Sequence, residues 1–169
     1  MTLICQSKRL NVRQFTLDDA PFIVELLNDA SFIRYIADKK VRTEQDAVEY
    51  LRHGPLASYQ AHGFGLNLVE RREDGEPIGM CGVLKRDELA YPDLGYAFLS
   101  RYTGQGYATE AAEAVLEATL LASGLSTVQA VTLPDNQPSN RLLEKLGFRL
   151  QSQIMLYEHS NNLYQYTRV

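Results

Sequence analysis

Two glycines follow an arginine where a predicted strand passes into a predicted helix, in FLSRYTGQGYATEAAEAVLEA, residues 98–118. Arg101, Gly104 and Gly106 form the pattern Arg-x-x-Gly-x-Gly. The first N–H groups of a helix have no partner within the helix, and glycines let them converge on an anion without an intervening Cβ. The loop could therefore bind a phosphate or pyrophosphate, with Arg101 and Thr109 as side-chain donors. Equally, the glycines could serve only a tight turn, and their spacing does not distinguish the two.

The loop differs from the common nucleotide-binding patterns. No Gly-x-x-x-x-Gly-Lys-Ser/Thr sequence occurs, and Thr109 stands where a dinucleotide-binding turn has a third glycine or alanine. An anion bound here is thus predicted to belong to neither ATP nor NAD. In the helix that follows, Glu110, Glu113 and Glu117 lie away from an alanine-rich stripe, and we interpret them as a solvated face.

The remaining reactive side chains form no recognisable set. No His, Cys, Asp or Glu residues have the spacing of metal ligands, so no metal is predicted. Cys5 and Cys81 lie far apart without a Cys-x-x-Cys pattern, and they are expected to be reduced and buried. His53 and His62 are interpreted as exposed polar residues.

Alternating strands and helices must position these residues. Apolar periodicity and turn residues predict the order β-α-α-β-β-β-α-β-α-β-β. The predicted helices span 16–29, 43–63 with an interruption near Gly54-Pro55, the segment from the glycine loop to about 124, and 138–147. The predicted strands span 9–16, 64–70, 78–85, 94–100, 127–133, 148–157 and 162–169. Because 94–133 reads strand, helix, strand, we expect one parallel crossover in an otherwise antiparallel sheet, an α+β fold.

Composition is that of an ordinary globular protein. The 169 residues predict a single domain over 1–169, with 45% hydrophobic and 22% charged residues. The net charge of −4 and the scattered Arg and Lys residues argue against a nucleic-acid partner. The first residues lack the apolar stretch of a signal peptide, and no run approaches the roughly 18 apolar residues of a membrane span. A cytoplasmic protein without a membrane partner is expected.

Two blocks of the sequence resemble the GNAT superfamily of acetyl-CoA-dependent N-acetyltransferases. RYTGQGYATEA matches the family's glycine loop, and VTLPDNQPSNRLLEKLGF (131–148) matches its strand, Asn-containing turn and short helix. The segment GQGYATEA is similar to the branch that acetylates ribosomal-protein N-termini. The resemblance implies a GNAT fold: a mixed, mostly antiparallel twisted sheet of six to seven strands, splayed in the middle, with about four helices. It also implies acetyl-CoA as acyl donor, without a metal.

The resemblance also assigns residues to coenzyme A. The pyrophosphate would lie on the loop amides, and the pantetheine arm would run along the preceding strand. The amide of Phe98 or Leu99 would polarise the acetyl carbonyl, and Asn136 and Asn140 would contact the pantetheine or the adenosine side. The full predicted set is Phe98, Leu99, Ser100, Arg101, Gly104, Gln105, Gly106, Tyr107, Ala108, Thr109, Asn136 and Asn140.

The catalytic residues implied by the resemblance depart from the pattern that many family members share. Many family members carry a proton-donating tyrosine on the last short helix, but Leu143 occupies that position here. By the branch resemblance, Ser139 would donate to the leaving sulfur; alternatively, it only caps the helix beside Pro138. Glu158 would be the base; alternatively, it is a solvated turn residue. Among the tyrosines around the expected cleft, Tyr96 included, none is assigned a catalytic role.

The function implied is transfer of an acetyl group to a primary amine by direct attack on the thioester. A protein N-terminus, that of a ribosomal protein by branch similarity, is the first expected acceptor. A small amine such as an amino acid, a polyamine or an antibiotic is the second. Leu143 raises a third alternative, a non-catalytic acyl-CoA-binding module. The protein is expected to be a monomer or a homodimer.

Overall fold

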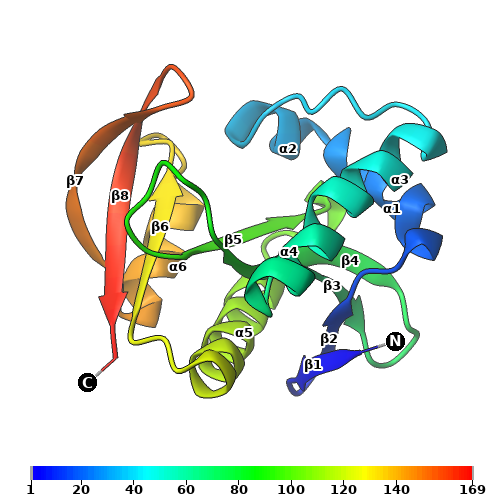
Figure 1. Cartoon of the computed structure of the whole chain (residues 1–169), viewed down its shortest axis with the longest axis horizontal. Coiled ribbons are helices and arrows are strands. Elements are labelled where there is room, and N and C mark those ends of the chain that lie inside the picture. The colour runs from blue at the N-terminus through cyan, green and yellow to red at the C-terminus, as the bar shows by residue number, and fades with distance from the viewer. Residues whose placement is uncertain (1, 169) are drawn as a thin grey trace.

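The computed structural model describes residues 2–168 and contains one eight-stranded sheet with the strand order β1-β2-β3-β4-β5-β6-β8-β7 (Figure 1). The strands are β1 (Leu3–Gln6), β2 (Leu10–Gln14), β3 (Leu66–Arg71), β4 (Pro77–Leu84), β5 (Asp93–Phe98), β6 (Thr127–Thr132), β7 (Arg149–Leu156) and β8 (His159–Thr167). The helices are α1 (Ala20–Leu27), α2 (Ala30–Tyr35), α3 (Glu44–His53), α4 (Pro55–His62), α5 (Tyr107–Ser123) and α6 (Gln137–Leu146). Short 3-10 turns span Leu17–Asp19 and Ser100–Tyr102.

The α+β class and the element order agree with the sequence-based expectation, but residues 2–168 contain more strands and helices than it gave. The interruption expected near Gly54-Pro55 divides the segment 43–63 into two helices, because Pro55 begins α4 without an N–H to continue the ladder. The extra helix α2 begins after Asp29, whose side chain accepts a hydrogen bond from the Ser31 N–H. The extra strand β1 pairs antiparallel with β2.

Two hydrophobic cores cover the two faces of the sheet. The helices α5 and α6 pack on one face, where the buried set includes Leu10, Val12, Cys81, Ala111, Val115, Leu143 and Tyr164. The helices α1, α2 and α3 pack with the other core, whose members include Phe15, Ile23, Phe32, Leu51, Leu68, Met80 and Leu99. The sheet is therefore buried on both sides near β4 and β5, which lets these strands be almost continuously apolar.

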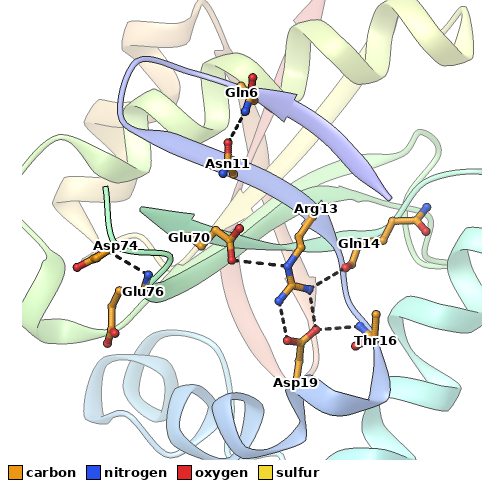
Figure 2. Close-up of polar contacts among 9 residues, drawn as sticks. All are labelled: Gln6, Asn11, Arg13, Gln14, Thr16, Asp19, Glu70, Asp74 and Glu76. Carbon is orange, nitrogen blue, oxygen red and sulfur yellow. Dashed lines mark hydrogen bonds and ion pairs between the residues drawn. The ribbon is translucent and has the colours of Figure 1, made fainter. Parts of the chain in front are cut away.

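A buried ion pair fastens β2 to the segment that leads into α1 (Figure 2). The Arg13 guanidinium donates to both carboxylate oxygens of Asp19, at 2.9 and 2.8 Å, and its Nε lies 3.6 Å from Glu70 on β3. Asp19 also accepts from the Thr16 N–H at 2.8 Å. The hydrogen bond to Asp19 raises the pKa of Arg13, so the guanidinium stays charged.

Candidate active site

The site begins where the sheet divides. Strands β5 and β6 are parallel and pair only at Asp93 and Gln129, after which they diverge (Figure 1). Asp93 is fully buried and receives two hydrogen bonds from Arg86, at 3.1 and 2.7 Å. Burial raises the pKa of Asp93, although the Arg86 charge opposes that rise. This bidentate pair holds β5 at the point from which the two strands separate.

Every second residue of β5 directs its backbone N–H and C=O groups into the gap between β5 and β6. The Leu99 N–H donates to Ile78 O on β4 at 3.0 Å, and Phe98 pairs with Gly79. Because hydrogen-bonded and free residues alternate along an edge of an antiparallel pair, the backbone groups of Tyr96 and Phe98 face away from β4. Of the two amides expected to polarise an acetyl carbonyl, that of Phe98 therefore faces the gap, whereas that of Leu99 is engaged within the sheet.

Ser100 lies just beyond the strand and is held by α2. Its N–H donates to Asp29 at 2.9 Å, and its hydroxyl donates to the other Asp29 oxygen at 2.5 Å. The Ser100 amide is thus also engaged inside the protein, so the expected strand-like contact with pantetheine would fall to the backbone of Phe98. On the opposite side of the gap, Arg34 of α2 forms an ion pair with Asp135 at 2.9 Å. Helix α2 therefore contacts both sides of the opening.

The glycine loop has the backbone that an anion site requires. Gly104 and Gly106 adopt left-handed φ values of 77° and 83°. The first N–H of α5 to bond backwards is that of Glu110, to Gly106 O at 3.1 Å. The N–H groups of residues 107–109 therefore precede the helical ladder and are available to a ligand. These features fit a pyrophosphate, and the helix dipole adds a favourable positive end.

Two side chains of the loop, those of Arg101 and Tyr107, contact other parts of the protein. The Arg101 guanidinium lies 3.5 Å from Glu25 and 3.7 Å from Glu76, so it is balanced by carboxylates. Tyr107 is buried beneath the guanidinium of Arg9, 4.3 Å from its ring centroid, and packs rather than reaching into the loop. Anion binding by this loop therefore depends mainly on backbone amides.

Glu110 stabilises the glycine loop through contacts with the turn between β1 and β2. Its interpretation as part of a solvated face is therefore wrong. Its carboxylate accepts from the Ser7 hydroxyl at 2.5 Å and from the Arg9 N–H and Nε, both at 2.8 Å. Arg9 also donates to Gln105 O at 3.1 Å, which orients a carbonyl of the loop itself. The pairing links the turn between β1 and β2 to the first turn of α5. Because Arg9 lies about a hundred residues away in sequence, helical periodicity could not reveal it.

Replacement of Glu110 by glutamine is expected to raise the KM for acetyl-CoA about fivefold, within the range for the net loss of one ordinary hydrogen bond. Burial acts to raise the pKa of Glu110, but hydrogen bonds from Ser7 and Arg9 outweigh it and lower that pKa below 4.5. The contribution of the Glu110 carboxylate to acetyl-CoA binding is therefore fully present above that pH, and it is lost as the pH falls through the lowered pKa. Steady-state kinetics measure the effect, with exposed Glu117→Gln on the same helix as control; equal KM values for the two variants would contradict it.

Ser139 lies across the gap from β5, in the first turn of α6. The N-cap residue of α6 is Asn136, so Ser139 does not cap the helix. Its hydroxyl oxygen lies 2.5 Å from the Tyr96 hydroxyl, a contact that joins α6 to β5. Leu143, where many family members have a tyrosine, is fully buried in the core between the sheet and the helices. Tyr96 is the site residue that sequence reasoning left without a role.

The two asparagines differ in their availability. The buried Asn140 accepts from Thr132 Oγ1 at 2.5 Å and from Asn162 at 3.4 Å, and it donates to Pro134 O at 3.2 Å. This network holds the turn between β6 and α6, so its side chain fits a structural role better than the expected coenzyme contact. The side chain of Asn136 is half-buried and makes no hydrogen bond to the residues that the structure describes.

Glu158 lies at the tip of the β7–β8 hairpin, which extends past the end of β6 (Figure 1). Tyr157 and Glu158 form a two-residue turn with left-handed φ values of 52° and 68°. Asn162 pairs with Thr132 at the end of β6, so Glu158 is four residues, roughly 13 Å, farther along β8. Its side chain is exposed and forms no ion pair within residues 2–168. The structure does not bring Glu158 into contact with Ser139.

Neither a metal site nor a membrane-spanning helix is found in the described part of the chain. Within residues 2–168, no three His, Cys, Asp or Glu side chains are grouped as metal ligands would be. No helix of this range combines the length and apolar character needed to cross a bilayer.

A sheet splayed between two parallel strands, with a glycine-rich helix entrance beside the gap, defines a protein that binds an anionic, extended acyl donor. Residues 9–149 match the family model of the acetyltransferase (GNAT) domain, and the chain belongs to this family. It is an acyltransferase that uses acetyl-CoA and acts on an amine acceptor. The residues of the glycine loop and of the gap between β5 and β6 fit this donor. The alternative of a non-catalytic module is therefore not retained.

Individual relatives support this membership over nearly the whole chain. The N-acetyltransferase YnaD of Bacillus subtilis is 31% identical over 143 residues, 85% of this chain and 81% of YnaD. A GnaT-family acetyltransferase structure from Bordetella pertussis has a TM-score of 0.82 and 25% identity, covering 99% of this chain and 100% of that one. The ribosomal L7/L12 α-N-protein acetyltransferase RimL, solved with coenzyme A, has a TM-score of 0.85 at 17% identity and covers 98% of each chain.

Proposed function

We propose that the acceptor of this N-acetyltransferase is the α-amino group of a protein N-terminus, a ribosomal protein being the first candidate. The observation that carries the proposal is the position of Ser139, which faces β5 across the gap while Leu143 is buried in the core. A serine rather than a tyrosine at this point is the pattern of the ribosomal-protein branch, to which the loop GQGYATEA is also similar. The shared fold with RimL agrees with this choice.

The proposed coenzyme site combines backbone amides with few side chains. The amides of residues 104–109 would hold the pyrophosphate, and the backbone of β5 around Phe98 would align the pantetheine arm. Asn136 is the proposed side-chain contact at the turn after β6. When bound, acetyl-CoA supplies an activated acetyl thioester with a thiolate leaving group. The remaining chemistry depends on how the protein moves protons and stabilises charge.

In the proposed reaction, the lone pair of the neutral amine forms a C–N bond with the thioester carbonyl carbon. The Phe98 N–H donates to the carbonyl oxygen as negative charge develops there. The C–S bond breaks with its electron pair on sulfur; the Ser139 hydroxyl gives its proton to that sulfur and regains one from solvent. The amine loses one proton to Glu158, directly or through a water, and the products are the acetylated amine and coenzyme A. Glu158 is proposed by its similarity to the branch that acetylates ribosomal-protein N-termini, and it lies in the β7–β8 turn beyond the end of β6.

An acceptor panel tests the proposal through release of free thiol from acetyl-CoA. Peptides with free N-termini are expected to give kcat/KM at least about tenfold above spermidine, lysine and an aminoglycoside, because the peptide residues after the amine add contacts that a small amine lacks. The same peptides with a blocked α-amine should show no turnover. A preference for a small amine would instead identify the second candidate acceptor and overturn the assignment to N-termini.

Replacement of Ser139 by alanine is expected to lower kcat about 100-fold, the lower range for loss of a general acid. The KM for acetyl-CoA should change little, because the loop amides and β5 remain. Ser152→Ala, on the exposed strand β7, is the matched control for Ser139→Ala. Glu158→Gln tests the proposed base in the same assay, with Glu73→Gln as its own control. A kcat for Ser139→Ala equal to that of the wild-type enzyme would remove Ser139 from the mechanism.

A further inference from the structure

We propose that Tyr96 is the positioning residue of Ser139, holding the serine hydroxyl so that its proton points toward the leaving sulfur. The proposal rests on the role of Ser139 proposed above and extends it to a residue on the opposite side of the gap. No sequence pattern assigns Tyr96 this role, and the geometry alone brings the two hydroxyls together.

The contact joins β5 to α6 close to the point where β5 separates from β6. Tyr96 pairs with Cys81 of β4, three residues beyond Asp93, where β5 has just separated from β6. Its hydroxyl reaches Ser139 Oγ at 2.5 Å, although the two residues are 43 positions apart. Since the backbone groups of Tyr96 also face the gap, the side chain and main chain of one residue border the space in which the thioester must lie.

The direction of the hydrogen bond follows from the chemistry of the two groups. Burial raises the pKa of the Tyr96 phenol, and the hydrogen bond with Ser139 offsets only part of that rise. The phenol therefore keeps its proton at neutral pH. A phenol is a better donor than an aliphatic hydroxyl, so Tyr96 donates to Ser139 Oγ. The serine proton is then free for a third atom.

This arrangement supports the departure of the thiolate. A chain in which Tyr96 donates to Ser139 and Ser139 donates to sulfur strengthens each of its hydrogen bonds, because each polarises the next in a low-dielectric site. It also keeps Ser139 from turning toward the backbone of α6, an alternative that serine side chains commonly take in helices. Tyr96 itself need not touch the substrate, so its effect passes through Ser139.

Kinetics of Tyr96→Phe test the proposal with the best acceptor of the panel. The variant is expected to lose about tenfold in kcat, the equivalent of one hydrogen bond, with the KM for acetyl-CoA within about twofold of the wild-type value. A merely structural role would instead raise KM or lower the melting temperature. Tyr164→Phe, which removes the hydroxyl of another buried tyrosine in the same core, is the matched control and should keep the wild-type kcat.

A double-mutant cycle separates this inference from the proposed function. If Tyr96 acts through Ser139, the double variant Tyr96→Phe/Ser139→Ala will be no slower than Ser139→Ala alone. Multiplicative losses, or a wild-type kcat for Tyr96→Phe beside an impaired Ser139→Ala, would overturn the positioning role and leave the proposed function intact. Wild-type activity of Ser139→Ala would overturn both.

Discussion

Gly104→Val is expected to raise the KM for acetyl-CoA about 100-fold, within the range for losing one hydrogen bond to a charged group. Gly104 has a φ of 77°, a region that a β-branched residue enters only with strain. The loop will relax toward an extended conformation, and the amides at the start of α5 will no longer converge on one anion. Steady-state kinetics and calorimetric titration with coenzyme A measure the loss.

The other end of the same helix provides a closely matched control. Gly124 has a φ of 73°, and a Cβ at either glycine would meet nothing within 4 Å. Gly124→Val therefore introduces a similar backbone strain without a steric clash and far from the loop. Both variants should lose similar thermal stability, but only Gly104→Val should lose affinity for coenzyme A. Equal coenzyme affinity in the two variants would contradict the anion site.

Asp19→Ala is expected to destabilise the fold by about 3–5 kcal/mol, because it leaves the Arg13 guanidinium buried without its main partner. Only 12% of the Arg13 side chain and 10% of the Asp19 side chain are exposed, and Glu70 is more distant at 3.6 Å. Such a loss is a large part of the roughly 5–15 kcal/mol of a typical domain. Urea unfolding followed by circular dichroism measures the difference.

An exposed ion pair serves as the control for this prediction. Asp38→Ala breaks the pair with Arg42, whose side chain is 50% exposed, and should cost much less stability because solvent screens an exposed pair. The double variant Arg13→Met/Asp19→Ala should be more stable than Asp19→Ala, since no unpaired guanidinium remains buried. If Asp19→Ala and Asp38→Ala cost the same, the buried pair does not stabilise the fold as argued.

The elements that sequence reasoning located correctly are those with local signals. Helix α5 has glycines at both ends, and α6 has Pro138 in its first turn and Gly147 just after its last residue; both helices were expected close to their observed bounds. The helix α2 was missed because its six residues carry too short an apolar pattern. A turn was expected over 158–161, but the observed turn is the shorter Tyr157–Glu158, because these residue types rarely adopt the left-handed φ that it requires.

The residues of the candidate site also fall into two groups: those that local sequence patterns locate and those that only the tertiary structure brings together. The glycine loop and the block around Ser139 were recognisable because their residues are close together in the sequence. Three features were not: the amide of Phe98 as the one facing the gap, Glu110 as a support for the loop, and Tyr96 as the partner of Ser139. Each depends on strand register or on a contact between distant segments.

The sequence by itself determined the family and the acetyl donor, and it located the glycine loop that we propose as the anion site. Glycine conformations, capping residues and apolar periodicity act over a few neighbouring residues, so they can be read from the chain. Only the tertiary structure decided which side chains meet, because the contacts of Arg9 with Glu110 and of Tyr96 with Ser139 join residues 101 and 43 positions apart. Such contacts arise from the packing of the whole sheet against its helices, and no local pattern encodes them.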